Sequence, residues 1–263
     1  MNIVTNGTRV HYEVSGKAGA PVVMLSHSLG SSMVMWQPQM EVLEAHFRVL
    51  RYDVRGHGDT EAPESPYALD QLGEDAVSLM DGLGIDRVHL VGLSMGGMIG
   101  QGLALNHSSR LRSLALCDTA AVLPQDARPI WQERIQRARE KGMTSLVDDT
   151  IARWFTQPFL AKSPPAVERI RTEFLATPVV GYVACSQAIM GLNYLGRLSG
   201  IKLPTLIVVG ADDPGTPVSA SEAIHRMISQ SQLVIIPAAA HLSNVEQPDA
   251  FNKALMDFLL AQP

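Results

Sequence analysis

The sequence lacks several features that mark particular classes of protein. Only two cysteines occur in 263 residues, Cys117 and Cys185, and neither has the spacing to other Cys or His residues that a metal site requires. The formal net charge is −5 and no dense run of Lys or Arg is present, so the electrostatic pattern of a nucleic-acid-binding protein is missing. We therefore expect no metal, no nucleic acid, two reduced core cysteines and a small-molecule ligand.

Long hydrophobic runs are also absent. No stretch of about 18 uninterrupted apolar residues occurs, which is the minimum for a membrane-spanning helix. The first residues do not combine a basic segment, an apolar stretch and a small-residue cleavage site, so they do not predict a secretory signal. The sequence predicts a cytoplasmic protein that is not integral to a membrane, and it leaves the oligomeric state open.

Apolar material for a buried core is plentiful, since 46% of the residues are hydrophobic and 18% are charged. Much of it falls into short continuous runs, as in strands that helices cover on both faces. An alternating segment, 10–14, predicts a further antiparallel strand at the edge of the sheet. The continuous runs are Pro21 to Leu25, Phe47 to Tyr52, Val88 to Val91, Leu111 to Leu116, Leu206 to Val209 and Leu233 to Ile236.

Helical patterns separate these runs, so strand and helix alternate along most of the chain. From residue 122 to 198 the alternation stops and only helix-like sequence follows, such as 130–141 and 144–155. We predict an α/β fold with a mostly parallel sheet, a core formed by 1–121 and 199–263, and a helical insert formed by 122–198. The helices predicted in the core are Leu69 to Leu83, Met95 to Asn106, Ala220 to Ser229 and Asp249 to Leu260.

A G-x-S-x-G motif, Gly92 to Gly96, stands between a strand and a helix. This context is the one in which the motif forms a nucleophile elbow, because the two glycines allow the sharp turn that exposes the serine hydroxyl. A Gly-rich turn can also simply join a strand to a helix, but the flanking elements favour a functional serine. We predict an α/β-hydrolase fold in which Ser94 is the nucleophile of a serine hydrolase.

Ser94 needs a base and a carboxylate that orients the base, and in this fold they follow in the order serine, acid, histidine. Asp212 and Asp213 both follow the strand 206–209, and the Gly-x-x-Asp-Pro spacing favours Asp213 over Asp212 as the acid. His241 lies in a loop after the next strand, where the base is expected. We predict the triad Ser94, Asp213 and His241.

The loop after the first buried strand, Ser26 to Gly30, has the position of the oxyanion loop of this fold. The main-chain N–H groups of Leu29 and Met95 are predicted to bind the oxyanion that forms when Ser94 attacks a carbonyl. His27 is expected to be structural, and the loop 55–58 is expected to brace the site.

These motifs, with 47–53, 116–121, 153–155 and 240–246, make the chain resemble the 3-oxoadipate enol-lactone hydrolases nearly end to end. The resemblance implies that residues 122–198 form a helical cap over the serine, with substrate contacts from Trp131 and Arg134 on its first helix. Trp154 is a further expected substrate contact. Arg134 would hold the carboxylate of an acidic lactone. Helix spacing alone favours surface ion pairs for Arg134 instead, and Trp131 and Trp154 have the competing role of anchoring the cap.

The resemblance implies a cytoplasmic carboxylic ester hydrolase that opens 3-oxoadipate enol-lactone through an acyl-enzyme, without a cofactor, in bacterial aromatic degradation. A carboxylesterase or a C–C bond hydrolase would keep the same triad, so these activities remain alternatives. A receptor that binds a small ligand with little turnover is an alternative from another class.

Overall fold

The computed structural model describes residues 1–162 and 164–262. Within them, an eight-stranded sheet has the order β1-β2-β4-β3-β5-β6-β7-β8, and β3 to β8 run parallel. Every predicted apolar run is a strand, so the predicted α/β fold is confirmed. The strands are β1 (Asn2–Thr5), β2 (Thr8–Gly16), β3 (Val22–Ser26), β4 (Arg48–Tyr52), β5 (Val88–Leu93), β6 (Leu111–Cys117), β7 (Thr205–Gly210) and β8 (Ser231–Ile236).

The predicted antiparallel strand exists as β2, but its predicted place at the edge of the sheet is wrong. β1 pairs with one side of β2 and β4 with the other. Asn6 and Gly7 connect β1 to β2, both with positive φ, 46° and 70°. An Asn-Gly pair favours a two-residue hairpin turn, so the sequence did carry a signal for β1 even though its residues are only partly buried or exposed.

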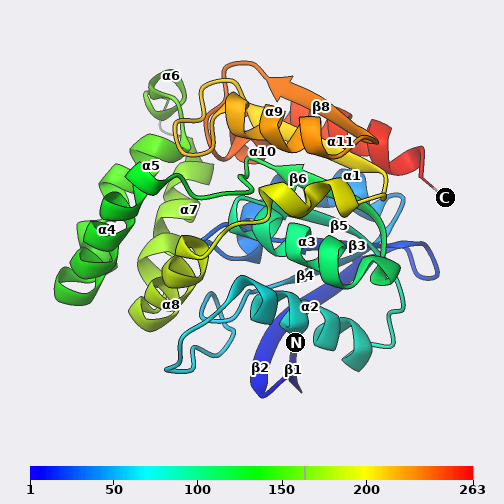
Figure 1. Cartoon of the computed structure of the whole chain (residues 1–263), viewed down its shortest axis with the longest axis horizontal. Helices are drawn as coiled ribbons and strands as arrows, with labels where there is room; N and C mark the ends of the chain where they lie inside the picture. The colour runs from blue at the N-terminus through cyan, green and yellow to red at the C-terminus, as the bar shows by residue number, and fades with distance from the viewer. Residues whose placement is uncertain (163, 263) are drawn as a thin grey trace.

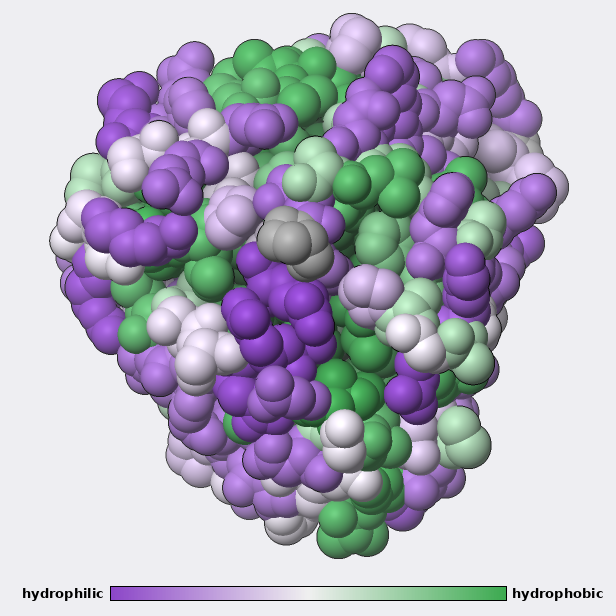
Figure 2. Space-filling view, turned by 90° about the vertical axis from the view of Figure 1, so that its right-hand side faces the viewer, coloured by the Kyte–Doolittle hydropathy of each residue, from purple (hydrophilic) through white to green (hydrophobic). Residues whose placement is uncertain are grey.

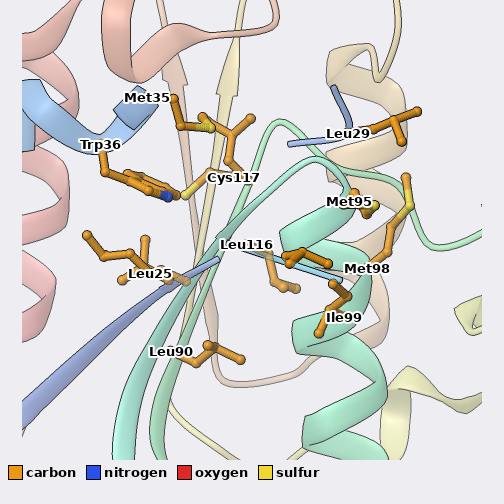
Figure 3. Close-up of a cluster of buried hydrophobic side chains, with 14 of the residues drawn as sticks. Leu25, Leu29, Met35, Trp36, Leu90, Met95, Met98, Ile99, Leu116 and Cys117 are labelled. Atoms are coloured by element: carbon orange, nitrogen blue, oxygen red, sulfur yellow. The ribbon is translucent and has the colours of Figure 1, made fainter. Parts of the chain in front are cut away.

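Helices cover both faces of the sheet. As a result, β3, β5 and β7 are buried at every residue. α3 packs on β5 and β6, and Figure 3 shows Met98 and Ile99 of α3 in one hydrophobic cluster with Leu90 and Leu116 of these strands. This packing anchors the helix that begins directly after Ser94. The helices around the sheet are α1 (Gln37–Glu44), α2 (Leu69–Gly82), α3 (Met95–Asn106), α9 (Val218–Met227), α10 (Ser243–Glu246) and α11 (Pro248–Leu260).

Between β6 and β7 the described residues form five α-helices that lie together on one side of the sheet (Figure 1). We call α4 to α8 the helical insert; its description as a separate cap subdomain stays a prediction. In the described part of 122–198 the only β pairing is an isolated bridge between Val122 and Asn193. The helices are α4 (Arg128–Lys141), α5 (Val147–Trp154), α6 (Gln157–Leu160), α7 (Pro165–Ala176) and α8 (Val179–Met190).

A close backbone contact joins the helical insert to the loop after β4. A Cβ atom added at Gly181 of α8 would lie 2.0 Å from the carbonyl oxygen of Gly56. One turn further along α8, the Cys185 thiol donates a weak hydrogen bond to the Arg55 carbonyl oxygen at 3.6 Å. The absence of side chains at both glycines therefore sets how closely α8 approaches the loop.

The face of the molecule away from the helical insert carries mostly hydrophilic residues interrupted by smaller hydrophobic patches (Figure 2). No single helix of the described residues has the length and apolar character to cross a membrane. α7 and α8 pass that test only as a pair, and they are bent by 95°. Cys117 and Cys185 are buried and unpaired, as predicted.

Candidate active site

Ser94 occupies a strained turn between β5 and α3. Its φ of 54° and ψ of −114° lie where residues with a side chain are rarely found. A Cβ atom at Gly92 would lie 2.2 Å from the Gly96 carbonyl oxygen, and one at Gly96 would lie 2.0 Å from the Ser26 carbonyl oxygen. The Ser94 amide donates a hydrogen bond of 2.9 Å to the Cys117 carbonyl oxygen. The two glycines and this bond keep the turn that the sequence motif predicts.

The three residues predicted as a triad form one continuous hydrogen-bonded chain. His241 Nε2 lies 2.9 Å from Ser94 Oγ, and His241 Nδ1 lies 2.8 Å from Asp213 Oδ2. All three residues are buried, with 8% of Ser94, 8% of His241 and 4% of Asp213 exposed. A base that is oriented by a carboxylate and touches a hydroxyl is the arrangement that activates serine as a nucleophile.

The carboxylate of Asp213 is held by its own loop. Its Oδ1 accepts hydrogen bonds from the amides of Gly215 and Thr216, and its Oδ2 accepts one of 2.6 Å from the Thr216 hydroxyl. Asp212 is exposed and lines a different cavity, so the structure brings Asp213 and not Asp212 to His241. The choice made from the Gly-x-x-Asp-Pro spacing agrees with this geometry.

Asp213 and His241 shift each other's proton affinity. Burial alone would raise the pKa of Asp213, but the charge of His241 and the hydrogen bonds from His241 and Thr216 lower it. Burial alone would lower the pKa of His241, but the charge and hydrogen bond of Asp213 raise it. The pair therefore stabilises an imidazolium beside Ser94, which is the species formed when the hydroxyl gives up its proton.

A second carboxyl group, Asp118, lies behind the triad and was not predicted as a site residue. Its Oδ1 accepts a hydrogen bond of 2.8 Å from the Gly210 amide, and its Oδ2 accepts one of 2.6 Å from the Ser243 hydroxyl. Asp118 thereby links the end of β7, before the Asp213 loop, to the start of α10, just after His241. Burial, and then the negative charge of Asp213, raise its pKa to about 8.

The two amides predicted for the oxyanion hole are free to bind a ligand. Neither the Leu29 nor the Met95 amide donates a hydrogen bond to any residue that the structure describes. Leu29 lines the same cavity as Ser94, and Met95 opens α3 directly after it. Two unpaired N–H groups near the nucleophile are the donors that a developing oxyanion requires.

Two buried histidines brace the oxyanion loop, as the sequence predicts for this region. His27 Nε2 accepts a hydrogen bond of 2.8 Å from the Val54 amide, and His57 Nε2 accepts one of 2.9 Å from the Gly30 amide. Burial lowers the pKa of both rings, that of His57 to about 3. Both rings stay neutral at ordinary pH, so their Nε2 atoms remain available as acceptors.

A cavity of about 80 Å³ opens onto the triad between the core and the helical insert. The three residues expected to contact the substrate, Trp131, Arg134 and Trp154, all line it. The Arg134 guanidinium carbon lies 4.8 Å from the centre of the Trp131 ring, while Trp154 also packs edge-on against Phe174. Trp154 thus faces the cavity and holds the insert together.

The surface ion pairs considered for Arg134 are made by its neighbour Arg137, which binds Asp149 at 3.0 Å and lies 3.6 Å from Glu133. Arg134 donates instead to the Tyr182 hydroxyl at 2.8 Å. It is half-buried and lines the same cavity as Ser94. Its environment therefore favours a ligand contact over a surface pair.

Sequence reasoning also missed Arg153 and Thr216, both of which line the cavity. Thr216 could have been found from its spacing, because a threonine three residues after an aspartate can bond that carboxylate within one turn. Arg153 carried no such signal, since only the folding of α5 over Ser94 places it there. In residues 1–162 and 164–262 no cluster of three or more His, Cys, Asp or Glu has an arrangement that could hold a metal.

Comparison with known proteins agrees with the fold. A 3-oxoadipate enol-lactonase of Acinetobacter baylyi is 37% identical over 246 residues, which cover 94% of this chain and 91% of that protein. The crystal structure of an enol-lactonase from Burkholderia xenovorans has a TM-score of 0.96 and 39% identity, covering 99% of this chain and 100% of that one. An esterase from Thermogutta terrifontis with malate bound has a TM-score of 0.91 and 30% identity, covering 99% and 97%.

These similarities confirm the resemblance to the 3-oxoadipate enol-lactone hydrolases that the sequence motifs indicated. Residues 21–248 match the protein family described as the alpha/beta hydrolase fold. The match spans the sheet from β3 to β8, the triad and the whole helical insert. The chain belongs to the α/β-hydrolase fold family.

Proposed function

We propose that the protein is a serine hydrolase that opens 3-oxoadipate enol-lactone to 3-oxoadipate, in the cytoplasm, during the bacterial breakdown of aromatic compounds. The observation that carries the proposal is the hydrogen-bonded chain Ser94–His241–Asp213 at a cavity that also contains Arg134. The relatives named as enol-lactonases support the choice of substrate.

In the first half of the reaction, Ser94 Oγ attacks the lactone carbonyl carbon and His241 Nε2 takes its proton. The amides of Leu29 and Met95 bind the resulting oxyanion. When the tetrahedral intermediate collapses, the ring C–O bond breaks and His241 returns the proton to the enol oxygen. This step leaves an acyl group on Ser94 with the rest of the opened chain still attached.

In the second half, His241 takes a proton from water, which attacks the acyl carbon. The bond between this carbon and Ser94 Oγ then breaks, His241 returns the proton to Oγ, and a new carboxylic acid leaves. The acid loses its proton and the enol converts to the ketone. The substrate enters with one carboxylate and the product leaves with two, together with one released proton. Ser94, His241 and water supply every proton and electron pair, so the proposal includes no cofactor.

Arg134 is the residue we propose to bind the carboxylate that the lactone already carries. A guanidinium can bind a carboxylate through two parallel hydrogen bonds, and the Trp131 ring beneath it leaves a flat surface for the lactone ring. The related esterase was solved with malate bound, and malate is a small carboxylate. An acidic substrate follows from these features.

The pH dependence of kcat/KM tests the role of His241. Because Asp213 raises the pKa of His241, and because the base must be neutral to accept a proton, we expect activity to fall as the pH drops through a value above the ordinary 6.5. The measurement is a pH profile of kcat/KM for lactone hydrolysis. An acid limb at or below pH 6.5 would contradict the assigned pair.

Replacing Arg134 by glutamine tests the carboxylate contact. Loss of a charge-assisted pair should raise KM for the lactone by about 10- to 100-fold, while turnover of a neutral p-nitrophenyl ester should change little. Arg139→Gln is the matched control, because Arg139 lies on the same helix and is exposed. Equal effects of Arg134→Gln on both substrates would show that Arg134 only supports packing.

The same two substrates test the proposed function against its alternatives. We expect the wild-type protein to prefer the lactone over the neutral ester, whereas a general carboxylesterase would prefer the ester. A fluorophosphonate probe should label Ser94 in the folded protein. No labelling would favour a receptor that binds a small ligand without turning it over.

A further inference from the structure

The catalytic cavity contains a second arginine, Arg153 of α5, that the mechanism above does not use. Its side chain lines the cavity together with Arg134, Ser94 and His241. It also lines a neighbouring groove of about 520 Å³, formed by α5, α6 and the loops after β7 and β8, which we call the outer groove. Arg153 is half-buried and is shared by the two cavities.

Neither arginine of the cavity has a carboxylate partner among the described residues. Arg153 donates a hydrogen bond of 3.2 Å to the Thr150 hydroxyl, and Arg134 donates to the Tyr182 hydroxyl. Asp149 of α5, whose negative charge raises the pKa of Arg153, is already bound by Arg137 at 3.0 Å. By contrast, Arg137 and Arg171 of the helical insert form ion pairs with Asp149 and Asp148.

The positive charges of Arg134 and Arg153 repel each other. Burial lowers the pKa of Arg153, and the positive charge of Arg134 lowers it further. A guanidinium nevertheless keeps its proton near neutral pH, so both charges remain in the cavity. Partly buried like charges are costly unless an anion opposes them. A ligand with two negative charges would neutralise both arginines.

We propose that Arg153 is a second carboxylate-binding residue, which makes the cavity a site for small dicarboxylates with one carboxylate on Arg134 and the other on Arg153. This inference deepens the proposed function and rests on it for its role in turnover. Hydrolysis converts a monoanion into a dianion, so Arg153 takes the carboxylate that the reaction creates. Because Arg153 also faces the outer groove, it binds that carboxylate at the boundary between the two cavities.

The test is a comparison of adipate with hexanoate, which have the same chain length but carry two carboxylates and one. Calorimetric titration of the wild-type protein should show adipate binding at least about 10-fold more tightly, because it gains one more charge-assisted contact. In Arg153→Gln this preference should fall below about 2-fold. Arg153→Lys should keep much of it, since the charge remains. Equal affinities in the wild type, or an unchanged preference in Arg153→Gln, would overturn the inference.

A second measurement separates binding from mere support of the fold. The charge of Arg153 lowers the pKa of His241, so Arg153→Gln should move the acid limb of kcat/KM to higher pH and Arg153→Lys should not. Arg139→Gln is the control for both readouts, and thermal melting checks that each variant folds. If both Arg153 variants lose binding of adipate and of hexanoate and melt at lower temperatures, Arg153 has a packing role and the inference is refuted.

The titrations do not depend on turnover, so the two proposals can fail separately. If the wild-type protein does not hydrolyse the lactone but prefers adipate through Arg153, the proposed function is wrong and the dicarboxylate site stands. If it hydrolyses the lactone and shows no preference for adipate, the proposed function stands and Arg153 has another role.

Discussion

Replacing Ser94 by alanine is expected to lower kcat for lactone hydrolysis by about 10⁶-fold, while the protein remains folded. The hydroxyl is the only group of the protein that forms a covalent bond to the substrate in the proposed mechanism. Amides that bind the oxyanion would leave a small residual rate above the reaction in water. The measurement is steady-state hydrolysis of the lactone together with fluorophosphonate labelling, which the variant should lose.

Ser186→Ala is the control for this variant. Ser186 is also buried, but its hydroxyl donates only to the Tyr182 carbonyl oxygen within α8, so its loss should leave kcat nearly unchanged. Full lactone hydrolysis by Ser94→Ala would remove the acyl-enzyme mechanism. Retained activity with lost labelling would show that the probe reports on a serine that the lactone reaction does not need.

Replacing Asp213 by asparagine should lower kcat by about 10⁴-fold. The Asp213 carboxylate accepts a hydrogen bond from His241 Nδ1, which leaves Nε2 free to take the proton of Ser94. An asparagine lacks the negative charge that stabilises the imidazolium. When its NH2 group donates to Nδ1, the ring carries its proton on Nε2 and cannot accept the proton of Ser94. The kinetic measurement should show the loss in kcat with a much smaller change in KM.

The neighbouring Asp212 provides the matched control for Asp213. Asp212→Asn should change kcat by less than about 2-fold, because its side chain is exposed on the outer groove and no step of the mechanism involves it. A large loss in Asp212→Asn, together with a small one in Asp213→Asn, would reverse the assignment of the acid. Comparable losses would point to disruption of the whole loop.

The local parts of the site could be predicted from the sequence because short-range sterics determine them. At Gly92 and Gly96 an added Cβ atom would lie about 2 Å from a backbone oxygen, so these positions require glycine. The sequence motif therefore predicts the geometry of the turn. The acid and base were found because each follows a recognisable buried strand in a parallel sheet, whose carboxyl ends meet at one edge. The edge strand β1 was missed because its residues carry no apolar pattern, although the Asn-Gly turn marked it.

Contacts between the insert and the core could not be predicted in the same way. Arg134 and Arg137 look alike on the helix 128–141, yet one faces Ser94 and the other binds Asp149 at the surface. Arg153 and Asp118 acquire their surroundings from segments far away in the chain. Asp118, for example, bonds Ser243, which lies 125 positions further along. Burial and charge, which give these residues their properties, depend on partners that no local pattern specifies.

The amino-acid sequence by itself therefore determined the order of strands and helices, the strained turn at Ser94 and the identity of its two partners, because chain sterics and strand order act locally. Only the tertiary structure decided which side chains share the cavity with Ser94. Packing α4, α5 and α8 over the sheet encloses Arg134 and Arg153 without an acid to neutralise them. That arrangement arises from long-range packing, and the proposed binding of carboxylates depends on it.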